Sequence, residues 1–170
     1  MFVVDTNVLI YAAAEESPFH PACRERLTAW RAQPDAWYVT WGILYEFLAV
    51  STHPRVMRKA WTARQAWTFV DDLLASPGLS VLVATELHAA VAAQVIADVP
   101  HLSGSLVHDA HTAVLMREHG IRTIYTRDTG FHRFPFVEPI DPIALHEPRR
   151  RYAGSRPTPR SGKALAAKRS

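Results

Sequence analysis

Four acidic residues, Asp5, Glu46, Asp109 and Asp128, lie in sequence contexts that are unusual for surface acids. Asp5 interrupts the apolar run of MFVVDTNVLI, and Glu46 is the only charge in WGILYEFLAV. If the fold gathers these carboxylates in one pocket, they repel one another and their pKa values rise. Mg²⁺ or Mn²⁺, which prefer oxygen ligands, would relieve that repulsion. A cation held by a few carboxylates, with water in its open positions, is suited to hydrolysis of phosphodiester bonds.

Each acid also has a purely structural explanation. Asp5 or Thr6 would cap the following helix, and Asp128 would form a turn. Asp109 would lie in the first turns of a helix, where the helix dipole favours an acid. Taken singly, these explanations are preferred for Asp5 and Asp128. Glu46 is harder to explain in this way, because a lone buried carboxylate costs several kcal/mol unless a remote arginine or a metal ion compensates its charge.

The elements that must position these acids follow from the apolar pattern. Short apolar runs predict strands at residues 2–4, 37–40, 79–83, 121–125 and 135–137. Helical spacing or composition predicts helices within residues 8–14, 21–31, 42–50, 61–74, 85–97 and 105–119, and Gly120 is expected to end the last of them. In the helix over 85–97, the residues expected to face inward are Leu87, Val91, Val95 and Ile96.

Strands that alternate with helices predict an α/β fold, with a central parallel sheet covered on both faces. Functional groups in such sheets collect beyond the carboxyl ends of the strands. Asp5 directly follows the first predicted strand, and Asp128 follows the strand over 121–125. The topology therefore favours a site that contains both.

Composition divides the chain into two parts. The 170 residues are 48% hydrophobic, enough for one folded domain, which we expect over residues 1–146. Residues 147–170 lose the apolar pattern and are predicted to form a disordered tail. Eight of the 19 basic residues lie after Glu147 and all 16 acids lie at or before it, so the first 147 residues carry a net charge of −5. The tail is expected to be a solvated appendage, with an RNA-binding arm as the alternative.

Other features bear on the compartment. Cys23 is the only cysteine, so no internal disulfide is possible, which fits a reducing compartment such as the cytoplasm. The N-terminus lacks a basic region before its apolar residues, so no signal peptide is expected. No segment has the roughly 20 apolar residues that a membrane-spanning helix needs. The sequence therefore predicts a soluble cytoplasmic protein without a membrane partner.

Four short segments carry a resemblance to a known family, and they are Asp5-Thr6-Asn7, Tyr45-Glu46-Phe47-Leu48, Asp109-Ala110 and Thr126-Arg127-Asp128. In this order, and in a chain of this length, they resemble the PIN-domain ribonucleases, and most of all the VapC toxins of bacterial toxin–antitoxin pairs. The resemblance covers residues 1–146 and extends to HPRVMRKAWTARQAW, LLASPG and FHRFPFVEPIDP. It implies a PIN-like α/β/α sandwich with a central parallel sheet, and endoribonuclease activity by metal-activated water.

The resemblance also implies roles for single residues and for partners. Asp5 and Asp109 would be the main ligands of Mg²⁺ (or Mn²⁺). Glu46 and Asp128 would complete the acidic pocket, by binding a second metal ion or by orienting water. The residues that would support Asp5 and Asp128 by hydrogen bonds are Asn7 and Thr126. The implied partners are an RNA substrate, a second copy of the chain in a homodimer, and a VapB-like antitoxin whose segment blocks the site.

Histidines and tryptophans have simpler explanations. The chain contains nine histidines but no H-E-x-x-H pattern, and His108 and His111 are expected at the surface or at the edge of a pocket. The five tryptophans are expected to pack in the core or in an interface. Stacking of an RNA base on Trp41 is the less favoured alternative.

Two other functions are compatible with parts of the pattern. The first is a phosphotransferase or phosphatase with Asp5 as nucleophile, but such sites commonly have a second acid two residues later, where this chain has Asn7. Lys59 is the only lysine before the tail, which also counts against that chemistry. The second is a non-catalytic RNA-binding or protein-binding module with a degenerate site, and the presence of all four acids counts against it.

Overall fold

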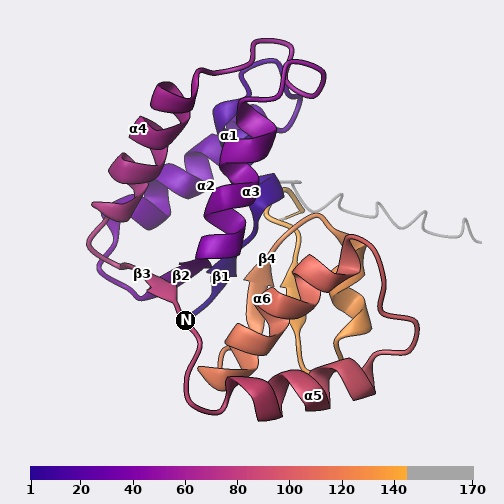
Figure 1. Cartoon of the computed structure of the whole chain (residues 1–170). Helices are drawn as coiled ribbons and strands as arrows, with labels where there is room; N and C mark the ends of the chain where they lie inside the picture. Colours follow the sequence, from indigo (N-terminus) through magenta and orange to yellow (C-terminus); the bar gives the residue numbers. More distant parts are fainter. Residues whose placement is uncertain (145–170) are drawn as a thin grey trace, which may run out of the picture.

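The computed structural model describes residues 1–144, so the predicted tail over 147–170 lies outside the described residues. Five strands and six α-helices occupy this part of the chain (Figure 1). The strands are β1 (Val3–Val4), β2 (Trp37–Thr40), β3 (Leu79–Leu82), β4 (Thr123–Tyr125) and β5 (Glu138–Ile140). The helices are α1 (Thr6–Ala13), α2 (His20–Ala32), α3 (Trp41–Ser51), α4 (Ala63–Leu74), α5 (His88–Asp98) and α6 (Leu106–Glu118), with a 3₁₀ turn η1 at Thr129–Arg133. None of these helices is long and apolar enough to cross a membrane.

All five strands are parallel, in the order β3-β2-β1-β4-β5, as the alternating pattern predicts. Val3 of β1 is in register with Tyr38 of β2 on one side and with Ile124 of β4 on the other. The chain first builds the sheet outward from β1 to β3, and then returns to add β4 on the opposite side of β1. The carboxyl ends of β1 and β4 therefore meet where the direction of winding reverses, which is the place where α/β sheets bind ligands.

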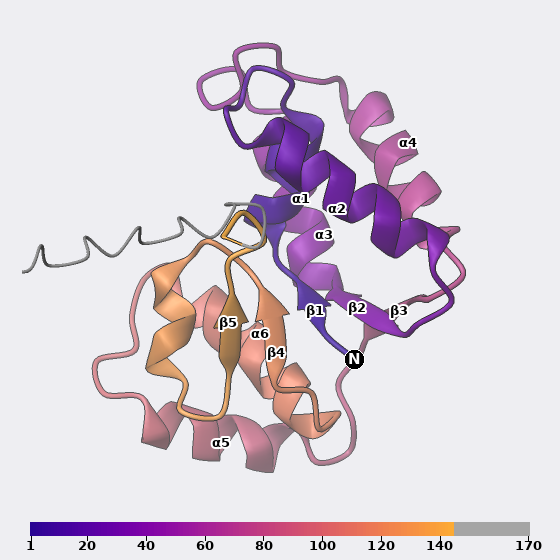
Figure 2. The ribbon, with the colours of Figure 1, turned by 180° about the vertical axis from the view of Figure 1, so that it is seen from behind.

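Helices lie on both sides of this sheet. The helix α6 lies in front of β4 in Figure 1 and behind β4 and β5 in Figure 2, whereas α2 faces the viewer in Figure 2. The core between the layers is apolar and includes Val3, Val4 and Trp37, which are fully buried. Trp30 is also buried, and its ring centroid lies 6.3 Å from that of Trp37, so two of the five tryptophans are core residues as expected.

Local sequence signals set several helix boundaries. The helix α4 begins with a capping box, in which Thr62 accepts a hydrogen bond from the Gln65 backbone N–H and the Gln65 side chain accepts one from that of Thr62. The helix α6 ends at Glu118 and is terminated by Gly120, whose positive φ of 66° allows the backbone N–H of Ile121 to donate to the carbonyl of Met116. The prediction that Gly120 ends this helix is confirmed.

Two predictions about the second half of the chain are wrong. The last strand is Glu138–Ile140 rather than 135–137, because Val137 closes a turn by donating to the carbonyl of Phe134. In the segment over 85–97, Val95 is buried as expected, but Leu87 and Ile96 are exposed. The helix α5 packs mainly on α6, so one of its apolar faces stays open to solvent.

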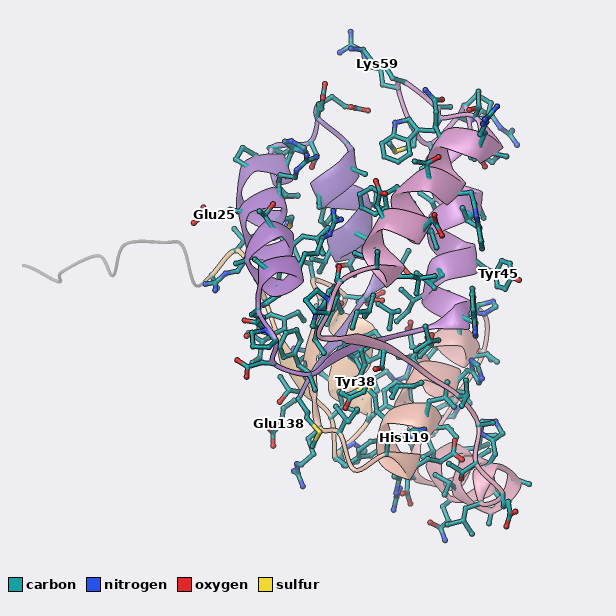
Figure 3. All side chains as sticks on the ribbon, turned by 90° about the vertical axis from the view of Figure 1, so that its left-hand side faces the viewer. Glu25, Tyr38, Tyr45, Lys59, His119 and Glu138 are labelled. Atoms are coloured by element: carbon teal, nitrogen blue, oxygen red, sulfur yellow. The ribbon has the colours of Figure 1, made fainter. Side chains whose placement is uncertain are left out.

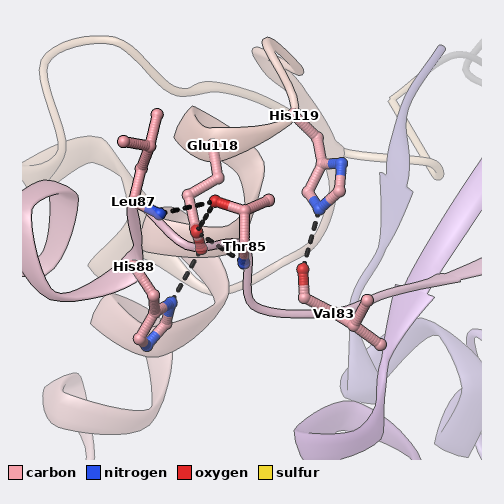
Figure 4. Close-up of polar contacts among 6 residues, drawn as sticks. All are labelled: Val83, Thr85, Leu87, His88, Glu118 and His119. Atoms are coloured by element: carbon pink, nitrogen blue, oxygen red, sulfur yellow. Dashed lines mark hydrogen bonds and ion pairs between the residues drawn. The ribbon is translucent and has the colours of Figure 1, made fainter.

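The connection from β3 to α5 is fastened to the end of α6 by Glu118 (Figure 4). The Glu118 carboxylate accepts hydrogen bonds from the Thr85 hydroxyl at 2.6 Å and from its backbone N–H at 2.9 Å, and it lies 2.7 Å from Nδ1 of His88. Burial alone raises the pKa of Glu118, but these hydrogen bonds and the His88 charge outweigh that effect and lower it. The Thr85 hydroxyl also accepts from the Leu87 backbone N–H, which explains why α5 begins at His88 and not at residue 85.

Candidate active site

Asp5 occupies the centre of the candidate site. It directly follows β1 and is the N-cap of α1, where its Oδ1 accepts a hydrogen bond from the Thr6 backbone N–H at 2.7 Å. Asp5 is only 7% exposed, and this burial raises its pKa to about 7. The nearby charges of Asp109 and Glu46 contribute to the rise. Asp5 therefore both caps a helix and presents a destabilised carboxylate to a pocket.

Asn7 and Thr126 hold the other oxygen of Asp5. Oδ2 accepts from the Thr126 hydroxyl at 2.6 Å and from the Asn7 amide at 2.5 Å. Thr126 follows β4, and its hydroxyl oxygen also accepts from the backbone N–H of Asp128 at 2.8 Å. The Asn7 carbonyl oxygen accepts from the backbone N–H of Arg127. These bonds fasten the ends of β1 and β4 together and fix the orientation of Asp5.

Glu46 reaches the site from α3 in a way the sequence did not predict. Its helix is half exposed, and Glu46 lies on the exposed side instead of being buried among apolar neighbours. The hydroxyl of Thr6 donates to Oε2 of Glu46 at 2.7 Å. The carboxylate therefore needs no buried arginine, because it borders a cavity and is held there by a hydroxyl from α1.

Asp109 lies in the first turn of α6 and is half-buried. Burial is the main cause that raises its pKa to about 6, and the charges of Asp128 and Glu46 add to the rise. The favourable helix dipole is thus outweighed by the surroundings of the carboxylate. Such a balance is typical of a functional acid.

Asp128 approaches from the loop after β4. It is the N-cap of η1, and its Oδ1 accepts from the Gly130 backbone N–H at 2.7 Å. A Cβ on Gly130 would lie 2.9 Å from Oδ2 of Asp109 and 3.1 Å from Oδ1 of Asp128, so the absence of a side chain there leaves room for both carboxylates. Asp128 thus forms a turn, and it also borders the cavity that Asp5, Glu46 and Asp109 line.

The four acids line two adjoining cavities. The smaller, of about 310 Å³, has all four in its walls together with Asn7. The larger, of about 440 Å³, shares Asp5, Glu46 and Asp109, and extends between α3 and α6. The remaining residues of the larger cavity are Gly42, Ile43, Tyr45, Ala49, His108, His111 and Thr112. His108 and His111 are thus exposed residues at a pocket edge, as predicted.

A hard divalent cation fits this donor set. The donors are oxygens, and two of the carboxyl groups have raised pKa values because burial, and to a lesser degree the neighbouring acids, disfavour their ionised forms. Within residues 1–144, no three carboxylate, imidazole or thiol groups lie close enough to enclose one ion. A cation bound here would therefore have few protein ligands and keep several waters, which is the habit of Mg²⁺.

The surroundings of Asp5 disfavour the phosphotransferase alternative. The hydrogen bonds from Thr6, Asn7 and Thr126 fix the carboxylate and leave one lone pair free, on Oδ1, which a cation could use. Within residues 1–144, no lysine or arginine lines either cavity at Asp5, so no basic side chain is placed there to hold a transferred phosphate.

Comparison with known proteins agrees with this geometry. The profile of the PIN domain matches residues 2–137, and so the parallel sheet with acids at its carboxyl edge is a PIN domain. Ribonuclease VapC48 of Mycobacterium tuberculosis is 30% identical over 140 residues, which cover 82% of this chain and 96% of that protein. Ribonuclease VapC37 of the same species is 32% identical over 145 residues, covering 85% and 99%. The chain belongs to the VapC ribonuclease family of PIN-domain proteins.

Solved structures share the fold at lower identity. Mycobacterium tuberculosis VapC20, described as a sarcin-ricin loop cleaving toxin, superposes with a TM-score of 0.57 at 21% identity, over 76% of this chain and 91% of that one. VapBC2 of Rickettsia felis, bound to a DNA fragment from its promoter, gives a TM-score of 0.60 at 14% identity, over 82% and 96%. The predicted PIN-like α/β sandwich with a central parallel sheet is confirmed.

Sequence reasoning missed two contributors to the site. Thr6 was considered only as a possible helix cap, yet its hydroxyl holds Glu46. The turn expected at Asp128 does not indicate that Gly130 borders both Asp109 and Asp128. The bond from Thr6 to Glu46 and the approach of Gly130 to Asp109 have no local signal, since each joins segments that are distant in the sequence.

Proposed function

We propose that this chain is a divalent-cation-dependent endoribonuclease and the toxin of a type II toxin–antitoxin pair. The observation that carries the proposal is the convergence of four carboxylates, from four different elements, where β1 and β4 end side by side. Membership of the VapC ribonuclease family supports RNA as the substrate. Mg²⁺ is the proposed cation, with Mn²⁺ as a substitute, because both ions bind oxygen ligands and can keep bound water molecules.

In this proposal Asp5 and Asp109 hold the cation. When bound, the cation lowers the pKa of water for attack on the scissile phosphate and offsets the charge that develops on the phosphate oxygens. Glu46 and Asp128 orient that water or help to hold a second ion. Thr126 and Asn7 keep Asp5 in one orientation, and Thr6 does the same for Glu46. Prior orientation matters because small displacements at a reacting centre reduce rates strongly.

The remaining parts of the proposal concern organisation and partners. We place the nuclease domain at residues 1–146 and a basic tail at 147–170. Solved neighbours titled as VapBC complexes support a VapB-like antitoxin as a partner of this chain. We further propose a homodimer that acts on RNA in the cytoplasm.

The test uses the full-length protein, purified free of antitoxin, and a structured RNA substrate. Cleavage should require Mg²⁺ or Mn²⁺, stop with EDTA and resume when the cation is restored in excess. The matched control is Asp71→Asn, which alters an exposed acid on α4 and should leave cleavage unchanged. Cleavage that continues undiminished in EDTA would contradict the cation-dependent mechanism.

A further inference from the structure

The larger cavity extends well beyond the acids that account for cleavage. The acids Asp5, Glu46 and Asp109 form one end of it. The other end lies between Tyr45 of α3 and His111 of α6, and no step of the proposed cleavage uses either side chain. A cavity of about 440 Å³ is within the usual size of a pocket for a small organic molecule. Its second end therefore has room for a part of the substrate other than the scissile phosphate.

Two large aromatic side chains of α3 lie at this second end: Tyr45 lines the cavity, and Trp41 lies beside Tyr45. Tyr45 is 63% exposed and Trp41 is 40% exposed, although both belong to a helix whose other face is in the core. Figure 3 shows Tyr45 projecting from α3 away from the body of the protein. The two residues are four positions apart, which places them on one side of the helix, and their ring centroids are 6.0 Å apart. Trp41 thus supports Tyr45 from one side and leaves much of its ring open.

The opposite wall of the cavity lies close to α3 at Gly42. A Cβ on Gly42 would lie 3.6 Å from Nδ1 of His111, so the backbone of α3 passes directly beside this imidazole. Ile43 and Thr112 line the same part of the cavity. Tyr45 and His111 thus border a slot with a partly apolar lining, and the His111 ring also packs edge-to-face with His88, with ring centroids 5.8 Å apart.

The position of the slot indicates what fills it. Tyr45 and Glu46 are consecutive on α3, and the Glu46 carboxylate is held at the acidic end by Thr6. In RNA, every phosphate carries a nucleoside on each side. A phosphate at the acids therefore brings a base to within reach of Tyr45. Unpaired RNA bases are commonly bound by stacking on aromatic or histidine side chains.

We infer that the slot between Tyr45 and His111 binds one unpaired nucleobase next to the phosphate to be cleaved, with Trp41 as a positioning residue behind Tyr45. This inference rests on the proposed ribonuclease function. It assigns part of the substrate selectivity to this slot, because a base held in a stacked helix could not enter it. The chemical class of ligand is thus an RNA segment with one extruded base.

Cleavage of modified RNA tests the slot. Once a cut has been mapped, the base on either side of that bond is replaced by an abasic ribose. Tyr45→Ala should lower kcat/KM on the natural RNA about tenfold, as expected for loss of one base–aromatic stack. Tyr45→Phe should retain the natural value. On RNA that lacks the bound base, Tyr45→Ala and the original protein should cut equally.

The matched control is Trp67→Ala, which removes another exposed tryptophan, on α4, that lines neither acidic cavity. It should change neither substrate's cleavage. If the abasic RNAs are cut as fast as the natural one, or if Tyr45→Ala slows all of them equally, no base is bound in the slot. If Tyr45→Ala is a monomer in sedimentation and its cleavage per site is unchanged, Trp41 and Tyr45 form a protein interface instead.

A binding measurement separates this inference from the proposed function. A single-stranded RNA containing the fluorescent base 2-aminopurine is mixed with full-length protein in Ca²⁺. Stacking on Tyr45 should quench the fluorescence, and Tyr45→Ala should abolish the quenching. Quenching through Tyr45 by a protein that cuts no RNA would contradict only the nuclease function. Cleavage without quenching at any position of the reporter would contradict only the base slot.

Discussion

A side-chain carbon on Gly130 would lie 2.9 Å from Oδ2 of Asp109, closer than such atoms approach in folded proteins. The same carbon would lie 3.1 Å from Oδ1 of Asp128. Gly130 is therefore a spacer between two carboxylates, and its φ is not positive. Glycine is required at this position because of the two neighbouring carboxylates and not because of the backbone conformation.

We expect Gly130→Ala to fold and to lose affinity for divalent cations. The added methyl group must displace the Asp109 or the Asp128 carboxylate, because the two leave no other space. Isothermal titration with Mn²⁺ should show a weaker Kd by roughly tenfold, comparable to the effect of disturbing groups that orient a metal ligand. Cleavage should fall in parallel.

The matched control is Gly78→Ala, which tests a tight glycine far from the acids. A Cβ on Gly78 would clash with the backbone carbonyl of Asp35 and lie 3.0 Å from that of Gln33. Backbone atoms yield less easily than side-chain ends, so this variant should melt at a lower temperature. Its folded fraction should nevertheless bind Mn²⁺ with the original Kd. Equal Mn²⁺ affinity in the Gly130→Ala protein would show that the carboxylates move without functional cost.

Asp109→Asn should abolish cleavage and yet raise the melting temperature measured in EDTA. Burial, with a smaller contribution from Asp128 and Glu46, raises the pKa of Asp109 to about 6, so its ionised form destabilises the metal-free fold at neutral pH. An amide of equal size removes that charge, and each kcal/mol relieved corresponds to roughly 2–4 °C. Mg²⁺ should then stabilise the original protein more than the variant, because binding to the folded state raises apparent stability.

Thermal melts with and without Mg²⁺, together with one RNA digest, check this prediction. Asp71→Asn on α4 serves as a control for a general effect of removing a charge. An Asp109→Asn protein that melts lower in EDTA and gains as much from Mg²⁺ as the original would make Asp109 a structural acid of α6. The carboxylate site would then have to be defined without it.

Most of the scaffold was predictable because its signals are local. The strand over residues 37–40 has the predicted bounds, and Gly120 ends α6 as its position in the sequence indicates. The last strand was misplaced for a physical reason. It contains Pro139, which lacks a backbone N–H, and such a residue is accepted here because β5 is an edge strand. The order of strands that makes β5 an edge is not a local property.

The candidate site was predictable in its membership but not in its geometry. The acids were detectable because each breaks an apolar pattern or follows a strand. The exposure of Glu46 could not be detected in the sequence, since its hydrogen bond from Thr6 joins residues 40 positions apart. The open faces of α3 and α5 were missed for a related reason, because apolar periodicity shows which face of a helix can be buried and not whether another element covers it.

Truncation after Glu147 should leave the fold intact and weaken RNA binding in a salt-sensitive way. The change removes eight positive charges from a chain whose first 147 residues carry a net charge of −5. For single-stranded RNA, each neutralised phosphate contributes a slope of about −0.7 to the dependence of log K on log salt concentration, so the slope should become shallower by at most about 6. Binding measured by fluorescence anisotropy over a salt series provides the test, and equal binding at low salt would identify the tail as an appendage.

The stability of the metal-free protein should fall as the pH rises from about 4 to about 7, and Asp5 should be a principal cause. Burial raises the pKa of Asp5 from 3.8 to about 7, so the folded state holds this proton more tightly than the unfolded state does. The resulting destabilisation is absent below about pH 4, grows through the interval and is complete above pH 7. At about 1.4 kcal/mol for each pKa unit, it has an upper bound of about 4 kcal/mol.

Urea denaturation in EDTA between pH 4 and pH 8, with the original protein and Asp5→Asn, isolates this contribution. The difference in the free energy of unfolding between the two proteins should shift in favour of Asp5→Asn as the pH rises, because only the original protein acquires a buried charge. With saturating Mg²⁺ the trend should weaken or reverse for the original protein, since a bound cation favours the ionised carboxylate. A difference that stays constant across the interval would mean that Asp5 is ionised in the folded protein at all these pH values. Its hydrogen bonds from Thr126 and Thr6 would then outweigh its burial, and the carboxylate would be stabilised before any cation binds.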